Sequence, residues 1–383
     1  MLVLYVLLIS YYHRGFRQLK SYKHTNIKGT TNVTIVIPAR NEADTIGPCL
    51  QSIIKQTYPV HLLQVLVVND FSTDATCAVV QQQINLQQSV ANGLAIELLH
   101  LQHYIQEGST NSYKKKGIEI AISKATGELI ICTDADCTAG TNWVSNIVSY
   151  YEKTNAQFIA APVCLIPSPT FKKENLGVRS FQTLDFATLQ GITAASVYKN
   201  FHTMCNGANL AYTKQAFEAV NGFAGIDALP TGDDMLLMYK IKKQFPTQIH
   251  YLKSEAATVQ SLTVPTWGQF INQRIRWASK ATAYDDKNIF YALLIVYFVN
   301  VFVVALSISL FFASQNWLWV LLYIVVKSSV EYWFLLPVLH FFKQQKLRKW
   351  FFICIPLHII YTVVAGAFGK FGKYSWKGRE IVP

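Results

Sequence analysis

The chain has 383 residues, 51% of them hydrophobic, and its 34 Lys and Arg against 22 Asp and Glu give a formal net charge of +12. A basic balance can indicate nucleic-acid binding, but here the positive charge lies largely beside apolar runs, as on the cytoplasmic side of membrane proteins. We therefore expect a membrane and no nucleic acid. The 7 cysteines include no Cys-x-x-Cys pair, which fits reduced thiols and argues against a metal site built on sulfur.

The first apolar segment, residues 1–13, is followed by positive charges that begin at Arg14 and Arg17. A cleaved signal peptide carries its charge before the apolar core, so this order predicts a membrane anchor with its N-terminus outside. Twelve apolar residues rise only ~18 Å as a helix, against a hydrocarbon core of ~30 Å. The region that follows is then expected in the cytoplasm.

Residues 30–285 alternate short β-branched runs with amphipathic stretches, which predicts one α/β domain with a mostly parallel sheet. Expected strands cover 33–37, which Pro38 would end, 64–68, 95–99, 128–132 and 157–163. Expected helices cover 43–56, 72–87, 114–124 and 142–153. Several acidic residues fall directly after a strand, at the carboxyl edge where open α/β sheets bind ligands.

Asp70 follows the strand at 64–68 and is surrounded by the short polar side chains of Asn69 and Asp74. Such a strand end can accept hydrogen bonds from a nucleobase or a ribose. A turn that caps the next helix would explain the same residues equally well, and we assign that capping role mainly to Asp74.

Asp134 and Asp136 lie together at the end of the strand at 128–132. Two hard oxygen donors so close suit Mg²⁺ or Mn²⁺, which usually take one or two carboxylates and the phosphates of a substrate. Asp-x-Asp also recurs in ordinary loops, so it is the strand end that favours a metal site for a leaving diphosphate. The lysines at 114–116 either face that phosphate or start a solvated helix.

Asp233 and Asp234 follow Pro230 and Gly232, which break the chain just ahead of an expected helix. A carboxylate there is ionised at neutral pH and can take a proton from an attacking hydroxyl. The alternative is favourable negative charge at a helix N-terminus. We take Asp234 as the candidate base.

Residues 273–277, Gln-Arg-Ile-Arg-Trp, follow 263–270 on an expected amphipathic helix at the membrane surface. The planar fork of Arg binds two phosphate oxygens at once, and a Trp face can stack on a sugar ring. The same residues could instead be interfacial anchors.

Three apolar runs follow. Residues 289–312 carry no charge and are long enough to span a bilayer. The run at 317–342 holds Lys327 and Glu331 one helical turn apart, either as a neutralised pair or as part of a lipid or polysaccharide path. The run at 350–371 contains Pro356 and predicts a bent span or a re-entrant hairpin. Positive-inside placement puts 315 outside and 343–349 inside, and it favours the basic tail, 372–383, inside as well, so 350–371 is the run expected not to span.

Taken in order, these motifs and Val-Ile-Pro-Ala-Arg-Asn-Glu at 36–42 resemble glycosyltransferase family 2, inverting nucleotide-sugar transferases of GT-A fold. The similarity is greatest to its membrane-attached branch, which includes cellulose, chitin and hyaluronan synthases and ceramide glucosyltransferases. The resemblance implies an integral protein of the inner or plasma membrane with a cytoplasmic catalytic domain. Its partners would be a nucleotide-diphosphate sugar donor and a lipid or membrane-associated glycan acceptor.

The resemblance also implies roles for individual residues. The donor would be bound by Pro38, Ala39, Arg40, Glu42, Asp70, Lys115 and Asp134. Mg²⁺ or Mn²⁺ would be held by Asp134 and Asp136, and the acceptor would face Asn206, Gly207, Asn209, Gln273 and Trp277. The reaction would be carried by Asp234 as base, with Asp233, Arg274 and Arg276.

Two alternatives stay open. A processive polysaccharide synthase is the nearest one, although the few membrane runs favour a single transfer. The other is a subunit of a membrane transport or assembly complex whose soluble domain only binds a nucleotide, which the pair Lys327 and Glu331 suggests.

Overall fold

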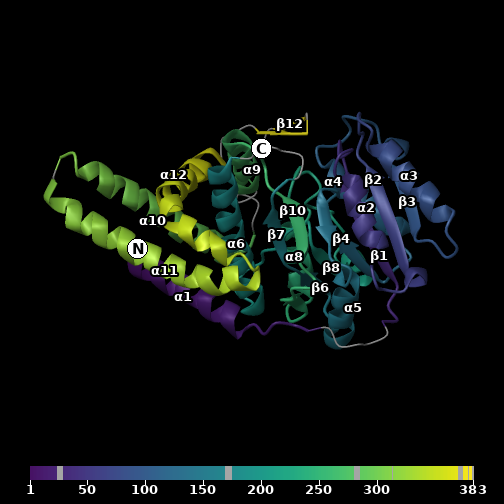
Figure 1. Cartoon of the computed structure of the whole chain (residues 1–383), viewed down its shortest axis with the longest axis horizontal. Coiled ribbons are helices and arrows are strands. Elements are labelled where there is room, and N and C mark those ends of the chain that lie inside the picture. Colours follow the sequence, from purple (N-terminus) through teal and green to yellow (C-terminus); the bar gives the residue numbers. More distant parts are fainter. Residues whose placement is uncertain are drawn as a thin grey trace. The chain divides into compact units, whose positions relative to one another are not determined.

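The protein is represented by a computed structural model that describes residues 1–23, 29–168, 175–279, 285–312, 314–369, 374–377 and 379–381 (Figure 1). Backbone contacts divide the chain into two compact units. Lys20–Cys164 and Met204–Leu262 form what we call the sheet unit, and Met1–Leu19, Leu165–Thr203 and Thr263–Pro383 form the helical unit. The domain expected over 30–285 therefore contributes segments to both units, and each unit is described by itself.

The sheet unit is built on seven strands in the order β3-β2-β1-β4-β8-β6-β9. The first four are parallel, namely β1 (Val33–Ala39), β2 (Leu63–Asn69), β3 (Ala95–His100) and β4 (Leu129–Cys132). The others are β8 (Leu210–Thr213), antiparallel to both neighbours, β6 (Phe158–Ala160) and β9 (Ile249–Tyr251). A smaller sheet has the order β5 (Cys137–Ala139), β10 (Val259–Leu262), β7 (Val163–Ile166). The predicted mostly parallel α/β architecture is confirmed.

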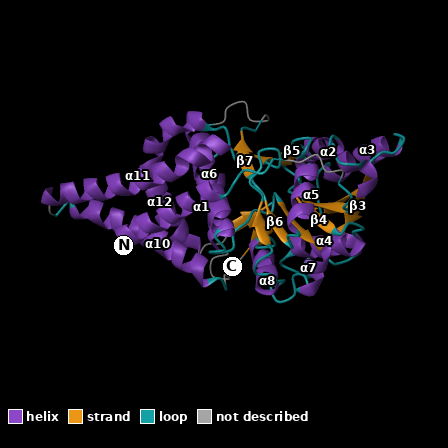
Figure 2. Cartoon of the chain, turned by 90° about the horizontal axis from the view of Figure 1, so that it is seen from below, coloured by secondary structure: helices purple, strands orange, loops and turns teal. Residues whose placement is uncertain are grey.

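Helices cover both faces of the larger sheet (Figure 2). From β1 to β3 the chain moves outward, with α2 (Ile46–Ile54) and α3 (Thr76–Gln88) on one face. It then returns past β1 to β4, and right-handed crossover places α4 (Tyr113–Lys124) on the other face. The strand order thus reverses between β1 and β4, and ligands of open α/β sheets bind at such a reversal. The remaining helical segments are α5 (Trp143–Thr154), α7 (Lys214–Ala219), α8 (Met235–Gln244), η1 (Val60–Leu62) and η2 (Leu101–His103).

Two strand predictions need correction at prolines. β1 does not end at Pro38 but continues to Ala39. The Val36 carbonyl accepts from the N–H of Thr133, the residue after β4, so the backbone of Val36 points toward β4. The backbone of Pro38, two residues on, points the same way, but the last residue of β1 that pairs with β4 is Val36. The missing N–H of Pro38 therefore costs no ladder bond. The strand expected at 157–163 is divided into β6 and β7 because Pro162 interrupts it.

The helical unit contains six helices in the part of the chain that the structure describes. They are α1 (Leu2–Gln18), α6 (Leu176–Tyr198), α9 (Trp267–Ala278), α10 (Lys287–Ser309), α11 (Trp317–Phe341) and α12 (Phe351–Gly369). Short turns η4 (Ser314–Asn316) and η5 (Gln345–Trp350) precede α11 and α12, and β11 (Tyr374–Trp376) pairs with β12 (Arg379–Ile381). Within the tail predicted at 372–383, residues 372, 373, 378, 382 and 383 lie outside the described residues.

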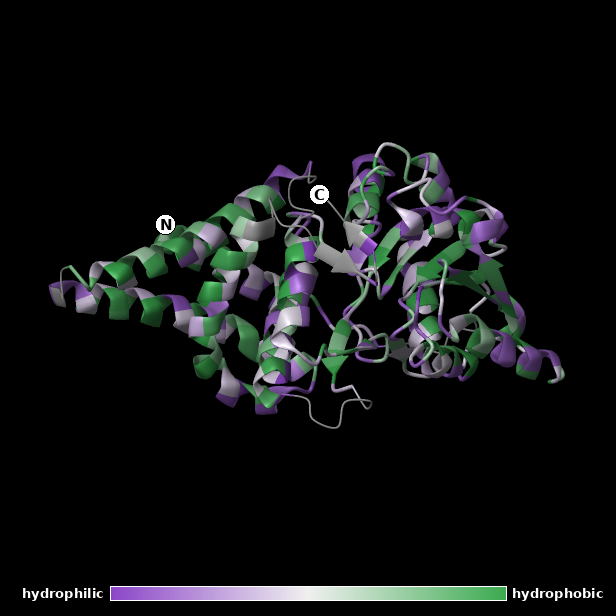
Figure 3. Ribbon diagram, turned by 90° about the horizontal axis from the view of Figure 1, so that it is seen from above, coloured by the Kyte–Doolittle hydropathy of each residue, from purple (hydrophilic) through white to green (hydrophobic). Residues whose placement is uncertain are grey.

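Three of these helical segments are long and apolar enough to cross a membrane: Lys287–Ser309, Trp317–Phe341 and Gln345–Ala367. The long helices of this unit are hydrophobic over most of their length (Figure 3). The N-terminal helix α1 extends to Gln18, past the apolar stretch. It buries Tyr5, Ile9 and Phe16 on one face, while Val3, Leu4 and Leu7 stay exposed on the other.

The charged residues of α11 form the predicted pair. The Lys327 ammonium donates to Oε1 of Glu331 over 2.6 Å, and the same oxygen accepts from the Tyr5 hydroxyl of α1. Lys327 is fully buried. The pair is therefore neutralised internally and also holds α1 against the middle of α11.

The last long helix lies across the other two. Near its start, Phe351 and Phe352 contact the ring of Tyr332 on α11, at 5.1 and 5.4 Å between centroids. Near its end, Gly366 packs directly on the ring of Tyr297 of α10. Counting 1.5 Å per residue, Tyr332 and Tyr297 lie roughly 14 and 15 Å from the same end of the α10–α11 hairpin. Within 351–369 α12 is one continuous helix, so the predicted re-entrant hairpin was wrong; its two ends contact α11 and α10 at similar distances from one end of their hairpin.

We expect Glu331→Gln to lower the free energy of unfolding by ~3–5 kcal/mol, because it leaves the buried Lys327 ammonium without a counterion. The double variant Lys327→Met/Glu331→Leu should recover most of that loss. Chemical denaturation of the purified protein in detergent measures both. As a control, Glu119→Gln breaks an exposed pair with Lys116 and should cost less than ~1 kcal/mol. A double variant as unstable as the single one would contradict this account.

Candidate functional site

The carboxyl ends of β1 and β2 are tied together by backbone bonds. The Asp70 N–H donates to the Ala39 carbonyl over 2.8 Å, and Nη1 of Arg40 donates to the carbonyls of Asp70 and Phe71 over 2.8 and 3.1 Å. The Arg40 guanidinium also lies 3.9 Å from the Asp70 carboxylate, and both side chains are almost fully buried. The predicted donor-binding residues Ala39, Arg40 and Asp70 are thus brought together as one rigid turn.

Two acidic residues near this turn support helix starts. Asp74 accepts from the N–H groups of Thr76 and Ala43, each over 3.0 Å, and so holds the turn before α3, whose N-cap position is occupied by Ala75. Burial raises the pKa of Asp74, but these hydrogen bonds outweigh it, so the pKa lies below its ordinary value. Glu42 accepts from the Thr45 hydroxyl over 2.6 Å, and its own N–H donates to the Thr76 hydroxyl over 2.7 Å. Both α2 and α3 begin several residues later than predicted because these capping turns occupy the expected first residues.

Asp134 and Asp136 emerge at the end of β4, both half-buried. Two cysteines lie beside them: Cys49 donates to the Asp134 carbonyl over 3.7 Å, and Cys137 donates to Oδ1 of Asp136 over 3.3 Å. Burial, and then the two carboxylates, raise the pKa of both thiols well above the ordinary value. The cysteines therefore stay protonated, and oxygen atoms alone are available to a cation here.

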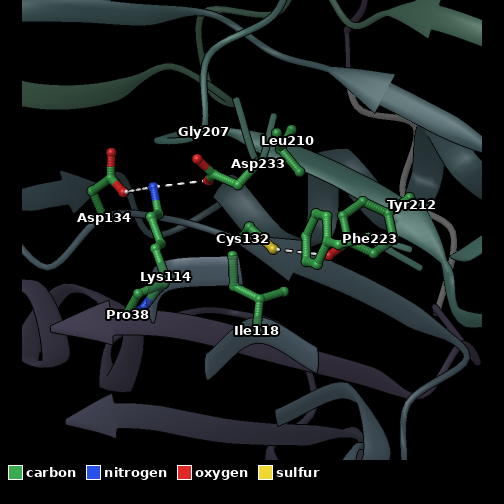
Figure 4. Close-up of a pocket in the computed structure, with 10 residues that line it drawn as sticks. All are labelled: Pro38, Lys114, Ile118, Cys132, Asp134, Gly207, Leu210, Tyr212, Phe223 and Asp233. Atoms are coloured by element: carbon green, nitrogen blue, oxygen red, sulfur yellow. Dashed lines mark hydrogen bonds and ion pairs between the residues drawn. The ribbon is translucent and has the colours of Figure 1, made fainter. Parts of the chain in front are cut away.

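Lys114 of α4 connects two distant acidic motifs. Its ammonium lies 2.9 Å from Oδ1 of Asp134 and 3.0 Å from Oδ2 of Asp233, as the dashed lines in Figure 4 show. Burial alone would lower the pKa of Lys114, but the carboxylates of Asp134 and then Asp233 outweigh it and hold the pKa well above 10.5. The amine is therefore a permanent cation between two anions.

The acidic pair precedes α8 as predicted, and its two members face differently. Asp234 is the N-cap: one carboxylate oxygen accepts from the Met235 N–H over 2.7 Å, and the other accepts from the Gly207 N–H over 3.2 Å. Asp233 instead reaches Lys114. A β-carbon at Gly207 would lie 3.3 Å from the Lys114 ammonium and 3.4 Å from Oδ2 of Asp233, so this position favours a residue without a side chain.

A pocket opens among these groups, and Figure 4 shows its lining. Its charged side is made by Asp134, Lys114 and Asp233, and its apolar side includes Ile118, Leu210 and Phe223. The other lining residues are Pro38, Cys132, Gly207 and Tyr212. Sulfur of Cys132 and the Tyr212 hydroxyl lie 3.5 Å apart, and burial raises the pKa of Cys132 to about 12.

Two residues predicted to bind ligands form hydrogen bonds inside the protein in this structure. Lys115 is buried, and its ammonium donates to the carbonyls of Ile226 and Leu229 over 2.5 and 2.7 Å. Lys115 points away from the acidic pair because consecutive residues of a helix, here Lys114 and Lys115 of α4, project in different directions. Asn209 is also buried: its amide donates to the carbonyls of Pro162 and Ala257 and accepts from the Trp143 indole. Its hydrogen-bonding capacity is used inside the core.

Asn206 and Gly207 remain beside the pocket. The Asn206 side-chain oxygen accepts from the Ala208 N–H over 3.0 Å, which shapes the turn that presents the Gly207 N–H to Asp234. The sequence motifs did not indicate Tyr212 or Phe223. Lys114 could have been separated from Lys115 by helical periodicity, since Lys114 and Ile118 are one turn apart and both line the pocket.

The residues at the β4 end fit a divalent cation by their chemistry. No cluster of three or more His, Cys, Asp or Glu side chains with metal-binding geometry occurs within the described ranges. Two carboxylates and no thiolate are the protein ligands typical of Mg²⁺ or Mn²⁺, whose remaining positions are filled by phosphate and water. Asp134 and Asp136 are the residues suited to hold one.

The motif at 273–277 belongs to the helical unit and lies on α9. Arg274 is buried there: Nε donates to Oδ2 of Asp185 on α6 over 2.8 Å, and the guanidinium stacks 4.1 Å from the ring centre of Trp277. Nη1 donates to the side chain of Gln273, and the Tyr361 hydroxyl of α12 shares the bond network. In this structure Arg274 therefore makes a buried ion pair with Asp185. Arg276 is half-exposed on the same helix.

Two family models match the chain. Glycosyl transferase family 2 matches residues 34–218, and Glycosyl transferase family group 2 matches residues 129–367. The first range begins in β1 and contains Asp70, Lys114 and Asp134. The second contains the acidic pair, α9 and the three apolar segments.

Curated relatives match over shorter stretches. Glycosyltransferase AglE of Haloferax volcanii is 27% identical over 131 residues, which is 34% of this chain and 39% of that protein. The 4,4'-diaponeurosporenoate glycosyltransferase of Staphylococcus aureus is 54% identical over 48 residues, 12% of each protein. The matched stretches therefore span less than two thirds of these relatives' length.

Among solved structures, the mannosyltransferase PcManGT from Pyrobaculum calidifontis, in complex with GDP-Man and Mn²⁺, matches with a TM-score of 0.52 and 18% identity over 97% of this chain and 100% of that one. This likeness concerns the fold, and it confirms the predicted GT-A architecture. The second family model alone covers well over half of the 383 residues. The chain belongs to Glycosyl transferase family group 2.

Proposed function

We propose that this chain is an inverting glycosyltransferase that moves a sugar from a nucleoside-diphosphate sugar to a lipid or membrane-associated glycan. One observation carries the proposal: Lys114 brings the Asp-x-Asp carboxylate of Asp134 and the acidic pair at Asp233 to one pocket at the carboxyl edge of the sheet. Family membership supports the reaction class, and the similar PcManGT was solved with GDP-Man and Mn²⁺.

The donor side follows from charge and position. Asp70 and the turn held by Arg40 would accept the nucleoside at the end of β2. The diphosphate would lie toward β4, where the Lys114 ammonium supplies positive charge. A divalent cation held by Asp134 and Asp136 would compensate the negative charge that develops on the leaving diphosphate.

The transfer is a single displacement. The acceptor hydroxyl oxygen forms a bond to the anomeric carbon as the bond from that carbon to the phosphate oxygen breaks, and the electron pair leaves with the diphosphate. The hydroxyl proton passes to the Asp234 carboxylate, which the N–H groups of Met235 and Gly207 hold in place. Attack from the face opposite the leaving group inverts the anomeric centre.

Two of the nucleophilic side chains that line the pocket, a thiol and a phenol, are held in the protonated form by burial. Cys132 is the thiol of the lining set, and its pKa of about 12 keeps it protonated at neutral pH. Burial raises the pKa of the Tyr212 phenol well above 10.0. Neither group is an activated nucleophile, so a covalent glycosyl-enzyme is not expected from them.

Asp233 is the alternative base, because it lines the pocket whereas Asp234 caps α8. Its carboxylate is already engaged by the Lys114 ammonium, at 3.0 Å. We therefore keep Asp234 as the base and assign Asp233 to holding Lys114.

The acceptor is proposed to be membrane-associated because the same chain carries three apolar segments of membrane-spanning length. Arg276 and Trp277 on α9 are the residues of the 273–277 motif proposed to face it. Because α12 lies across the α10–α11 hairpin, we infer that few helices cross the membrane. Few crossings favour a single sugar transfer over export of a growing polysaccharide. The length of the product formed on incubation with donor distinguishes a single transfer from a processive synthase. Any sugar transfer by the purified protein excludes the alternative of a subunit that only binds a nucleotide.

Metal dependence is expected from Asp134 and Asp136. Activity of the purified chain should disappear in a chelator and return with Mg²⁺ or Mn²⁺, measured as nucleoside diphosphate released with acceptor present. Full activity in the presence of a chelator would contradict the proposed metal site but not the proposed glycosyl transfer.

Asp234→Asn should reduce kcat by ~10²–10⁴-fold with little change in donor affinity, because the amide keeps the shape and loses the proton acceptor. Initial rates and calorimetric donor binding test this. Asp233→Asn is the matched variant, expected to weaken donor binding through Lys114. A normal rate for Asp234→Asn together with loss in Asp233→Asn would transfer the base role to Asp233. Unfolding midpoints control for the lost cap, which is worth ~1 kcal/mol.

Topology is tested by labelling single cysteines in intact cells, since all seven native cysteines are buried or half-buried. Gln315→Cys should react with an impermeant reagent from outside, and Lys346→Cys should not, because basic loops stay inside. Ser375→Cys is expected to be protected as well, since α12 lies across the hairpin and does not reach its far end. The opposite pattern at 315 and 346 would overturn the cytoplasmic placement, and labelling at 375 would make α12 a span.

A further inference from the structure

The residue after Asp70 has an unusual backbone. Phe71 has a φ of 49°, in the left-handed region that favours glycine and, after it, Asn and Asp. A bulky side chain there is disfavoured, because its β-carbon crowds the carbonyl that follows. The other non-glycine residues of the sheet unit with such φ values are Asn41, Asn92, Asn155 and Asn221, in the ranges that the structure describes. Phe71 therefore stands out as an aromatic residue in a position suited to Gly or Asn.

The surrounding turn imposes this conformation. Arg40 donates to the carbonyls of both Asp70 and Phe71, over 2.8 and 3.1 Å. On either side, the Asp70 N–H bonds to Ala39 over 2.8 Å and the Ser72 N–H bonds to the Asn69 side chain over 3.0 Å. Strained residues that are held by so many fixed bonds cluster at ligand-binding sites.

The ring of Phe71 is also fixed in place. It lies edge to face with Tyr113, at 5.7 Å between centroids and 81° between planes. Tyr113 opens α4 and is itself anchored, since its hydroxyl accepts from the Gly108 N–H over 2.6 Å. Tyr113 is buried, whereas Phe71 is half-exposed. An aromatic ring backed by a second ring and partly open on its outer side is a stacking platform.

The position of Phe71 in the sheet indicates what stacks there. It follows β2, while Asp134 follows β4, with β1 between them. Neighbouring strands are ~4.8 Å apart, so the ends of β2 and β4 are separated by roughly 10 Å along the sheet edge. A ligand whose diphosphate lies at β4 therefore places its far end, a planar nucleobase, near Phe71.

We propose that Phe71 determines donor affinity by stacking with the nucleobase, and that Tyr113 holds its ring for this purpose. The inference rests on the proposed function, because it takes the ligand to be a nucleoside diphosphate. The backbone strain at Phe71 is then retained for recognition, since Gly or Asn would suit the turn better and would present no ring.

The test compares a ligand that has a base with one that lacks it. Binding of UDP, GDP, CDP and dTDP, and separately of inorganic pyrophosphate, is measured by calorimetry with Mn²⁺ on the purified full chain in detergent. In Phe71→Asn the tightest-binding nucleotide should bind at least ~5-fold more weakly, since Asn accepts the backbone and removes the ring. Pyrophosphate should bind as in wild type.

Three further variants sharpen the comparison. Phe71→Tyr keeps the aromatic face and should bind nucleotide as wild type does. Phe71→Leu keeps apolar bulk without a flat ring and should weaken nucleotide as Asn does, which keeps the test decisive if Phe71→Asn folds poorly. Asn155→Gly, at another residue of positive φ at the end of α5, should change nothing.

The outcomes separate the two levels of the argument. Unchanged nucleotide binding in Phe71→Asn and Phe71→Leu overturns the stacking role while the proposed function stands. Equal weakening of nucleotide and pyrophosphate overturns it too, because it shows that Phe71 only shapes the turn. If the wild-type chain binds none of the four nucleotides, it is the proposed function that fails.

Discussion

The ammonium of Lys114 between the carboxylates of Asp134 and Asp233 is the interaction on which the arrangement of the site depends. The end of β4 and the start of α8 each bring acidic side chains to one pocket, and such charges would repel one another without a cation between them. Because the lysine is on α4, its charge is delivered by the helix that crosses to the opposite face of the sheet. The placement of α4 by the fold and the attraction between Lys114 and the two carboxylates therefore favour the same arrangement of these residues.

Much of the fold was predictable because it follows from patterns that repeat. The β-branched runs of β1, β2 and β4 indicate buried parallel strands, and acidic residues directly after such runs must meet at one sheet edge. Composition alone did not predict which lysine of this cluster lines the pocket. Lys114 and Lys115 have the same chemistry, and only the register of α4 places one in the pocket and the other among backbone carbonyls.

Asn209 and Arg274 illustrate the same limit. A polar side chain in a motif is equally suited to contact a ligand or to satisfy the core, and the choice depends on neighbours far away in sequence. For Asn209 these are Trp143, Pro162 and Ala257. In the three apolar segments, the length of the run indicates how far a helix can reach but not its direction. The path of α12 across the α10–α11 hairpin therefore became apparent only from its contacts with Tyr297 and Tyr332.

The ion pair of Arg274 with Asp185 has a consequence for how this protein can be recombined with relatives. Asp185 lies on α6 and Arg274 on α9, with Tyr361 of α12 in the same network. A chimera that imports α9 alone, with a residue other than Arg at 274, would leave a buried carboxylate without its partner. The three helices therefore form a single unit of exchange, although β8, α7, α8, β9 and β10 lie between α6 and α9 along the chain.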